Sequence, residues 1–349
     1  MTTQDILPFL RVNGTNYEIG FQIGQHFKDR IKNTLDNLPA FRENREWDEK
    51  NPERLNKIKN ISEKYFPQYM EELKGYAEGS GIEFRDIFIH NYKHMPRADN
   101  CSTGIFKFES NTLIAHNEDA HPIMGKNAYF LYEELENGTS FFAYSYPGIL
   151  PGMSFGFNSH GIFFCCNSLP DPTKSIGISR IFLGRNMFEQ KTIEDALLAA
   201  QRYTPRSGGA NYNIVFLKTN VTVNLETTGN ASYRTDITDR FFHTNHYISE
   251  GFGPKNFPIG ERSISKERLE GGLKLLYNVE KNTKGLLQVL SDDTVFVNFR
   301  ETGNKFQTNG TALVEVVKGE DIDLKFFPAT QEKKEYQHFI LSKLLLNYQ

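Results

Sequence analysis

The residue types that could do chemistry gather within twenty positions of the chain. Cys101 stands at the head of an apolar run, followed by Ser102 and Thr103, and a second apolar run ends in His116-Asn117-Glu118-Asp119. A cysteine thiol is a nucleophile once deprotonated, and a carboxylate can hold a proton or orient a base. We therefore treat this segment as a candidate active site.

The polar pair Ser110-Asn111 separates the two runs and predicts a β-hairpin closed by a two-residue turn. Residue numbers then pair across the hairpin to a constant sum of 221, which is the sum of the two turn positions. Ser102 would lie opposite Asp119, with Cys101 as its diagonal neighbour. We expect this pairing to bring a thiol and a carboxylate within reach of each other.

Each of these residues also has a purely structural interpretation. An unpaired cysteine is most often a small buried hydrophobe, but Cys101 follows a polar loop and precedes a strand. Cys165 and Cys166 lie inside an apolar run and must face opposite sides of a strand, so we expect core positions. The structural interpretation of His116 is a polar residue at a strand end, and that of Asp119 is a turn or cap residue.

The two histidines His116 and His121 suggest a metal site, but their spacing is wrong for one. They lack the i,i+4 spacing of a helical zinc site, and residues five apart on a strand face opposite sides. We therefore expect no metal. A Cys–His protease arrangement stays open, because nine histidines offer partners for a thiolate, although none stands in a recognisable local signature.

The composition excludes several classes of protein. The chain has 349 residues and a net charge of −3, without a basic stripe, so we expect no nucleic-acid partner. It carries 29 Phe and 16 Tyr, enough for a large core, and its three cysteines make no disulfide framework. The N-terminus lacks a signal-peptide pattern, and no apolar run is long enough to cross a bilayer. We expect a cytoplasmic protein that does not bind membranes.

The pattern of elements predicts an α+β fold in a single domain, 1–349. Residues 1–98 are mostly helical in pattern, and strands dominate from Cys101 onward. The predicted helices are Tyr17–Leu35, Pro52–Ala77, Glu83–Tyr92, Ile178–Gln190, Thr192–Tyr203, Ser263–Tyr277 and Lys284–Leu290. After the first hairpin the predicted strands are Tyr129–Glu136, Thr139–Tyr146, Ser154–Phe157, Ile162–Asn167, Tyr212–Leu217, Val221–Glu226, Phe241–Asn245, Thr311–Val317 and Ile322–Phe327.

Seven segments of the chain, by their residues and their order, resemble the penicillin acyltransferase-like family of N-terminal-nucleophile (Ntn) hydrolases. That family includes the insect β-alanyl-dopamine hydrolases and, more distantly, the bile-salt and penicillin V amidases. Any one motif is weak, whereas their common order is specific. The matching segments are Val12–Gly20, Leu73–Ile82, Cys101–Thr103, His116–Asp119, Gly148–Gly161, Asn167–Leu169 and His243–His246.

The resemblance implies a four-layer αββα sandwich of two mainly antiparallel sheets, preceded by a helical segment. It also implies that the precursor cuts itself between Asn100 and Cys101. Residues 1–100 would be a helical pro-segment and 101–349 the catalytic fragment, and the two would stay together as a heterodimer. Asn100 departs from the glycine that is frequent before the nucleophile in relatives, but asparagine also adopts unusual backbone angles.

The resemblance further assigns a role to each candidate residue. Cys101 would be the nucleophile, and its freed α-amine, with an unperturbed pKa of roughly 7.7–8.0, would be the base. Asp119 would orient that amine, and Asn245 would donate to the oxyanion, with Asn167 as a further oxyanion or substrate contact. His116 would contact substrate, where the bile-salt amidases carry arginine. The family's late arginine is either Arg268 or Arg300.

These roles predict a self-processing cysteine amidohydrolase. It would cleave a linear N-acyl amide, either an N-acyl amine or an N-acyl amino acid, through a thioester on Cys101 and without a cofactor. One alternative is an acyltransferase, in which an amine replaces water at the thioester. Another is a non-catalytic binding protein on the same scaffold, although such a protein has no reason to keep Cys101, Asp119 and Asn245 together.

Overall fold

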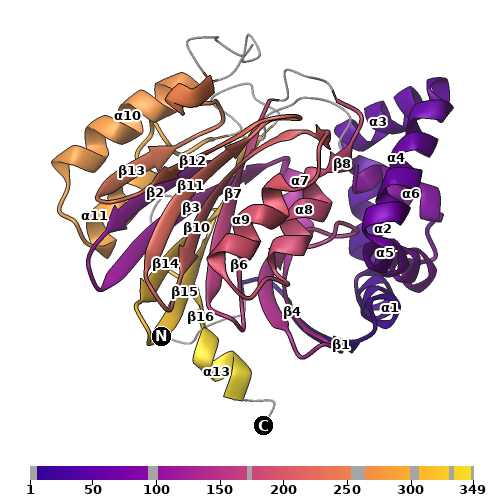
Figure 1. The fold of residues 1–349 in the computed structure, drawn as a ribbon, viewed down its shortest axis with the longest axis horizontal. Helices are drawn as coiled ribbons and strands as arrows, with labels where there is room; N and C mark the ends of the chain where they lie inside the picture. The colour runs from indigo at the N-terminus through magenta and orange to yellow at the C-terminus, as the bar shows by residue number, and fades with distance from the viewer. Residues whose placement is uncertain are drawn as a thin grey trace.

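Two β-sheets stacked face to face form the centre of the molecule, and helices cover both outer faces (Figure 1). The computed structural model describes residues 6–92, 101–170, 175–252, 264–298, 306–329 and 334–346. Aromatic rings from both sheets meet between them: Phe326 of one sheet contacts Phe130 and Tyr144 of the other, with ring centroids 5.2 and 5.5 Å apart. The α+β sandwich predicted from the sequence is confirmed.

The first sheet has eight strands in the order β1-β4-β5-β6-β7-β10-β11-β12. All neighbouring strands are antiparallel except β1 and β4, which run parallel. The strands are β1 (Phe9–Gly14), β4 (Tyr129–Leu135), β5 (Ser140–Ser145), β6 (Phe155–Asn158), β7 (Ile162–Leu169), β10 (Gly209–Phe216), β11 (Val221–Thr227) and β12 (Ser232–Asp236).

The second sheet has six antiparallel strands in the order β13-β2-β3-β14-β15-β16. A separate short pair joins β8 (Ile178–Ser179) to β9 (Arg206–Ser207). The six strands are β2 (Ser102–Lys107), β3 (Asn111–Ala120), β13 (Arg240–His243), β14 (Gln307–Val317), β15 (Asp321–Pro328) and β16 (Gln337–Ile340).

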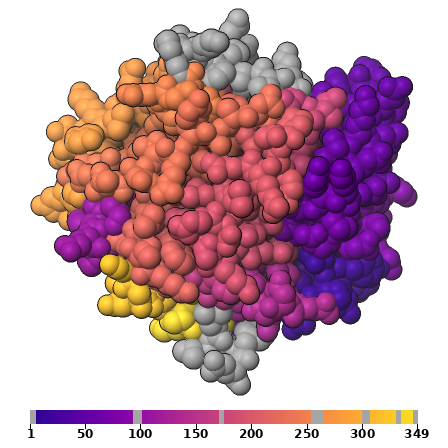
Figure 2. Space-filling view, in the orientation of Figure 1, coloured from indigo at the N-terminus to yellow at the C-terminus, as the bar shows by residue number. Residues whose placement is uncertain are grey.

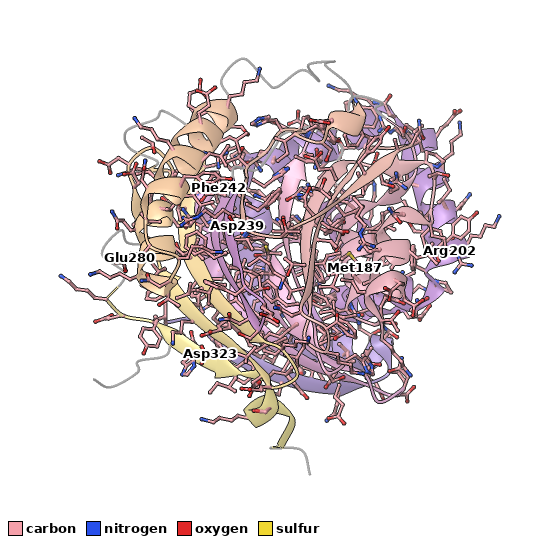
Figure 3. All side chains as sticks on the ribbon, turned by 60° about the vertical axis from the view of Figure 1, so that its left-hand side comes forward. Met187, Arg202, Asp239, Phe242, Glu280 and Asp323 are labelled. Carbon is pink, nitrogen blue, oxygen red and sulfur yellow. The ribbon has the colours of Figure 1, made fainter. Side chains whose placement is uncertain are left out.

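Helices complete the outer layers. On the first sheet, Phe188 at the end of α8 packs against Phe164, with ring centroids 4.5 Å apart. On the second sheet, the Phe242 ring packs against Gly272 of α10, and Figure 3 shows Phe242 beside that helix. The helices concerned are α8 (Arg180–Met187), α9 (Ile193–Gln201), α10 (Ser265–Asn278) and α11 (Thr283–Ser291), with α7 (Pro122–Asn127), α13 (Leu341–Leu346) and the 3-10 turn η1 (Glu250–Phe252) between or after them.

The N-terminal helices form one flank of the molecule and abut the rest of the visible face (Figure 2). Two of them, α1 and α5, cross with their backbones in contact. The closeness is seen at Gly20, where an added Cβ would lie only 2.0 Å from the Glu72 carbonyl oxygen. The helices are α1 (Asn16–His26), α2 (Lys28–Asn37), α3 (Pro39–Lys50), α4 (Pro52–Tyr65), α5 (Pro67–Ser80) and α6 (Phe84–His90).

Within this flank the structure divides helices that the sequence predicts as continuous. The helix expected over Tyr17–Leu35 breaks at Phe27 into α1 and α2, and the one expected over Pro52–Ala77 breaks before Pro67 into α4 and α5. Proline lacks the N–H that a continuing helix needs, so Pro67 begins a new helix. The predicted stop near Gly81 is confirmed, since that residue adopts a left-handed conformation with φ 70°.

The prediction of a mostly helical N-terminal segment omitted strand β1. Its six residues pair in parallel with β4, so their extended conformation depends on a partner more than a hundred positions away. Strands β8, β9, β12 and β16 and helices α3, α7 and α13 were also missed, and Ile178–Ser179 of β8 was predicted as the start of a helix. The remaining predicted strands all appear, with the hairpins at Gly138 and Gly161 closed by glycines in a positive-φ conformation.

The register predicted for the first hairpin was wrong by two residues. Ser102 pairs with Asn117 and Thr103 with His116, so the constant sum is 219. The turn spans Phe108 to Asn111, and the Phe108 backbone N–H donates to the Asn111 carbonyl oxygen. Asn111 is the first residue of β3, and its side chain donates to Glu315 of β14. A shift of two leaves every side chain on its predicted face, because strand side chains alternate with period two.

Helix length also bears on the relation to membranes. Across the part of the chain that the structure describes, every helix is too short or too polar to cross a bilayer.

Candidate active site

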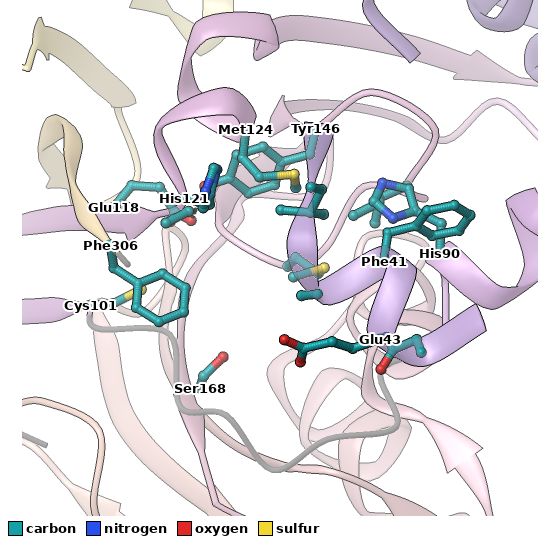
Figure 4. A pocket seen from close by; sticks show the side chains of 16 residues that line it. Phe41, Glu43, His90, Cys101, Glu118, His121, Met124, Tyr146, Ser168 and Phe306 are labelled. Carbon is teal, nitrogen blue, oxygen red and sulfur yellow. Dashed lines mark hydrogen bonds between the residues drawn. The ribbon is translucent and has the colours of Figure 1, made fainter. Parts of the chain in front are cut away.

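Cys101 lies in a pocket between the ends of the two sheets and the N-terminal helices (Figure 4). In that view Cys101, Glu118 and Phe306 stand on one side, and Phe41 and His90 face them from helices α3 and α6. The walls are largely apolar, with Glu43 and His121 among the polar exceptions. Further lining residues are Leu38, Ala40, Asn44, Ala120, Met124, Tyr146, Ile149, Met153 and Ser168.

The thiol of Cys101 is buried beside an imidazole and a carboxylate. Its Sγ, a ring nitrogen of His116 and a carboxylate oxygen of Glu118 all lie within 4.8 Å of one another. The observed hairpin register explains this cluster, because its continuation puts Cys101 across from Glu118 rather than Asp119. Burial, reinforced by Glu118, raises the pKa of the Cys101 thiol to about 11, although contact with His116 opposes the rise.

The hydrogen bonds around His116 define where its protons lie. The Thr103 hydroxyl donates its single proton to Asn167 at 2.8 Å, so Nδ1 of His116, also 2.8 Å from that hydroxyl, must donate to it. Nε2 lies 3.1 Å from Oε2 of Glu118, a contact that needs a proton between the two atoms. Burial alone lowers the pKa of His116, yet the nearby thiols and Glu118 hold it well above its usual value.

Glu118 is held by two hydroxyl donors that adjoin strands β5 and β6 of the other sheet. Tyr146 donates to Oε1 at 2.5 Å, and Ser154 donates to Oε2. Together with Nε2 of His116, these two hydroxyls fix the Glu118 side chain next to the thiol.

Asp119 lies on the opposite face of β3 from the thiol. Its Oδ1 accepts from the Thr308 hydroxyl at 2.7 Å, and its Oδ2 has no hydrogen-bond partner among the described residues. Nη1 of Arg268 is 3.8 Å from that oxygen. Burial raises the pKa of Asp119 to about 7, and Arg268 and Thr308 reduce the rise.

Arg268 of helix α10 joins the strand that begins at Ser102 to the loop that carries Asn245. Its guanidinium donates to the Cys101 carbonyl oxygen at 2.8 Å, to the Ser102 hydroxyl at 2.7 Å and to Oδ1 of Asn245 at 2.6 Å. Of the two arginines left open by the sequence, Arg268 is therefore in the site. Arg300 lies outside the described residues.

Asn245 follows β13 and is fully buried. Its Nδ2 donates to the Ser168 carbonyl oxygen at 3.0 Å, and Ser168 lines the pocket. The loop is fixed by Glu226, which accepts from His243 at 2.7 Å and from the backbone of Ile248 at 2.8 Å. Burial favours the protonated form of Glu226, but these donors keep its pKa below the usual value.

Asn167 lies between the sheets rather than on the pocket wall. Its Oδ1 accepts from Thr103, and its Nδ2 has no partner within the described part of the chain. Cys165 shares this inner face, 3.8 Å from the Thr103 hydroxyl, whereas Cys166 alternates to the outer face of β7. Both cysteines are buried, as the sequence predicted.

The structure thus places the sequence-predicted residues in two groups. Cys101 and His116 lie on the inner face, while Asp119 and Asn245 meet through Arg268 on the side of helix α10. Asn100 lies outside the described residues, and His121 caps helix α7 away from His116 by accepting from the Ile123 backbone.

Sequence reasoning missed Glu118, Tyr146 and Ser154. Glu118 could have been predicted, because it is two positions from His116 and therefore lies on the same face of the strand. Once the hairpin register is known, Glu118 is also the residue across from Cys101. Tyr146 and Ser154 carry no local signal, since only the stacking of the two sheets brings them to Glu118.

These features define a class of protein: an α+β sandwich with a buried cysteine at the start of a strand, in a pocket at the ends of two stacked sheets. Residues 107–326 match the family described as "Acyl-coenzyme A:6-aminopenicillanic acid acyl-transferase", and the chain belongs to that family. The family predicted from the sequence is confirmed.

One similar protein is named "Beta-alanyl-dopamine/carcinine hydrolase" and comes from Drosophila melanogaster. It is 29% identical over 221 residues, which cover 54% of this chain and 56% of the relative. The chain therefore matches about half the length of that curated relative. The two descriptions, an acyltransferase and a hydrolase, agree with the predicted class of enzyme, which cleaves amide bonds or transfers acyl groups.

Proposed function

We propose that this protein is a cysteine amidohydrolase that cleaves a linear N-acyl amide through a thioester on Cys101. The observation that carries the proposal is the position of Cys101 in a largely apolar pocket, backed by Asp119 and by the Arg268–Asn245 pair. Family membership and the hydrolase named among its relatives support the same reaction class.

Maturation begins with hydrolysis of the peptide bond between Asn100 and Cys101: water adds its oxygen to the Asn100 carbonyl carbon to give a carboxylate, and the nitrogen takes a proton and becomes an α-amine. In the intact chain the Cys101 thiol has a pKa of about 11, so it is almost entirely protonated near neutral pH. A freed α-amine, with a pKa near neutrality, is a suitable base for it. Oδ2 of Asp119, which lacks a partner among the described residues, accepts a hydrogen bond from the new ammonium group.

The reaction then follows the order of a covalent acyl transfer. The α-amine takes the thiol proton, and the sulfur attacks the amide carbonyl carbon. The C–N bond breaks, the departing amine takes the proton, and the acyl group stays on sulfur as a thioester. Water attacks the thioester carbon, releases the carboxylic acid and restores the thiol.

Asn245 stabilises the oxyanion of this reaction. An amide side chain has two N–H groups, and the Ser168 carbonyl oxygen takes one of them. The second N–H is left for the oxygen that gains charge when sulfur attacks. The guanidinium of Arg268 holds the amide in this orientation by donating to its oxygen.

The two fragments stay together after scission. The N-terminal segment contributes strand β1 to the first sheet and the pocket residues Phe41 and His90. Its buried residues Ile19, Ile23 and Tyr76 belong to the main core. Dissociation would expose this surface to water, so we expect a non-covalent heterodimer of 1–100 and 101–349.

The pocket favours a substrate with apolar parts and a polar end. Phe41, Met124 and Phe306 offer apolar contact, and Glu43 places a carboxylate among the lining residues. A carboxylate suits a cationic group, such as the amine of a β-alanyl group. The Drosophila relative is named for β-alanyl-dopamine and carcinine, so β-alanyl amines are the first compounds to test.

Acyl transfer is the second candidate. The family description names an acyltransferase, and the largely apolar walls around Cys101 limit the access of water to a thioester. An amine that enters this pocket would then compete with water for the acyl group.

Maturation is tested on the purified full-length chain. Gel electrophoresis and mass spectrometry are expected to show fragments 1–100 and 101–349 that elute together in gel filtration. Cys101→Ala should stay whole, and Cys166→Ala, which changes a thiol on the outer sheet face, should cleave normally. A wild-type chain that stays whole contradicts the maturation step.

Activity is tested with a panel of N-acyl amines and N-acyl amino acids that includes β-alanyl amines. Mass spectrometry of rapidly quenched samples should show an acyl group on the Cys101-containing fragment. Addition of a second amine separates the two reactions, because transfer yields a new amide and hydrolysis yields only acid. A protein with no acylation and no reaction of Cys101 with thiol-directed reagents is a binding protein, and the proposal fails.

A further inference from the structure

We propose that Cys101, His116 and Glu118 form a binding site for a thiophilic divalent cation, Zn²⁺ by chemistry, whose occupation blocks the nucleophile. The site does not depend on self-cleavage, because all three side chains are in place in the intact chain. The proposed amidase reaction does not use a metal. A bound ion would occupy the sulfur of Cys101, and its binding would therefore hold the protein inactive.

The spacing of the three ligand atoms fits a tetrahedral ion. Sulfur, nitrogen and oxygen at ordinary zinc distances, about 2.3, 2.05 and 2.1 Å, stand roughly 3.4 to 3.6 Å apart around the ion. Nε2 of His116 and Oε2 of Glu118 are 3.1 Å apart, and all three ligand atoms lie within 4.8 Å of one another. The site therefore forms by side-chain movements of about an ångström, without a change in the strands.

The three ligands already have the supporting contacts that metal sites use. A metal-binding histidine usually donates its second ring N–H to a fixed acceptor. Nδ1 of His116 donates in this way to the Thr103 hydroxyl, which leaves Nε2 for the ion. Tyr146 and Ser154 orient Glu118 in the same manner.

Charge balance also favours the ion. Zn²⁺ with one thiolate, one carboxylate and one neutral imidazole carries no net charge, so the buried site gains none. The ion takes the place of two protons, the one on the thiol and the one between His116 and Glu118. A thiolate and an imidazole select zinc over magnesium or calcium, which prefer oxygen ligands.

The ion has an entry path and an open coordination position. Cys101 and Glu118 line the pocket, whereas His116 lies behind them, so an ion that enters the pocket meets two of its ligands first. The fourth position faces the pocket and takes water. A bound ion removes the sulfur lone pair that would attack an acyl group.

The experiment is calorimetric titration of the full-length, chelator-treated protein with zinc sulfate. We expect one zinc per chain, and Co²⁺ in its place should produce a thiolate-to-cobalt charge-transfer absorption. Cys101→Ser, His116→Gln and Glu118→Gln should each weaken zinc binding by at least about a hundredfold, since loss of a supporting contact alone typically costs 10–100-fold. Zinc should also protect Cys101 from iodoacetamide.

Two matched variants serve as controls. Cys166→Ala removes a buried thiol on the outer face of β7, and His160→Gln changes a histidine at the β6–β7 turn. Both should bind zinc as the wild type does, and circular dichroism should show that every variant is folded. Absence of stoichiometric binding, or equal affinity in all three site variants, overturns the inference. Either result would leave the amidase assays untouched.

Discussion

Replacement of Asp119 by asparagine should remove a specific dependence of stability on pH in the intact chain. The pKa of Asp119 is about 7 in the folded state, against 3.8 for an ordinary aspartate, because the carboxyl group is buried, and Arg268 and the Thr308 hydroxyl offset this burial only in part. Between these two values the folded chain holds a proton that the unfolded chain has released. The free energy of unfolding therefore falls as the pH rises through this window and is level above it.

The size of the effect follows from the two pKa values. Each pH unit inside the window changes the free energy of unfolding by about 1.4 kcal/mol. With the folded pKa at about 7, the loss between about pH 5 and about pH 8 is about 2.5 kcal/mol. Asparagine has no proton to lose, so the variant lacks this contribution.

The assay is urea unfolding at several pH values in a Cys101→Ala background, which keeps the chain intact. The double variant Cys101→Ala/Asp119→Asn should gain about 2.5 kcal/mol relative to Cys101→Ala as the pH rises across this range. Other titrating groups cancel in the comparison. A difference that does not vary with pH, or that varies in the opposite direction, would show that Arg268 holds Asp119 ionised and would refute the reasoning.

Three further predictions concern catalysis and packing. Asn245→Ala should lower kcat/KM for the best amide substrate by about 10²–10³-fold, and an unchanged value removes it from the oxyanion site. Arg185→Met removes the cation that pairs with the buried carboxyl groups of Glu72 and Glu133 and should lower the free energy of unfolding in urea by about 3–5 kcal/mol. The control Arg234→Met, at an exposed ion pair, should lower it little. Gly20→Ala forces a Cβ to within 2.0 Å of the Glu72 carbonyl oxygen and should lower stability by about 1–3 kcal/mol, and an unaltered melting temperature would contradict that contact.

The hairpins and helices that signal themselves locally were predictable. Asn137-Gly138 closes the β4–β5 hairpin because glycine adopts the positive φ that the turn needs, here 79°. Thr192 caps helix α9 by accepting from the Asp195 backbone. In such cases the residues that decide the conformation are only a few positions apart.

The register of the first hairpin shows where local reasoning ends. The sequence favoured Ser110-Asn111 as the turn, but Asn111 forms a hydrogen bond with Glu315 of a distant strand and pairs in β3 instead. Since the shift was by two residues, the predicted faces survived although the predicted partners did not. The carboxylate beside the thiol became Glu118 rather than Asp119.

The sequence by itself determined the family, the α+β class and the segment that holds the candidate site, because these depend on the order of motifs and on short-range patterns. Only the tertiary structure decided which groups surround Cys101. Arg268 reaches its carbonyl oxygen from 167 positions away, and Tyr146 and Ser154 reach Glu118 only because the two sheets stack. Contacts of this kind depend on packing between distant elements, and no spacing in the sequence encodes them.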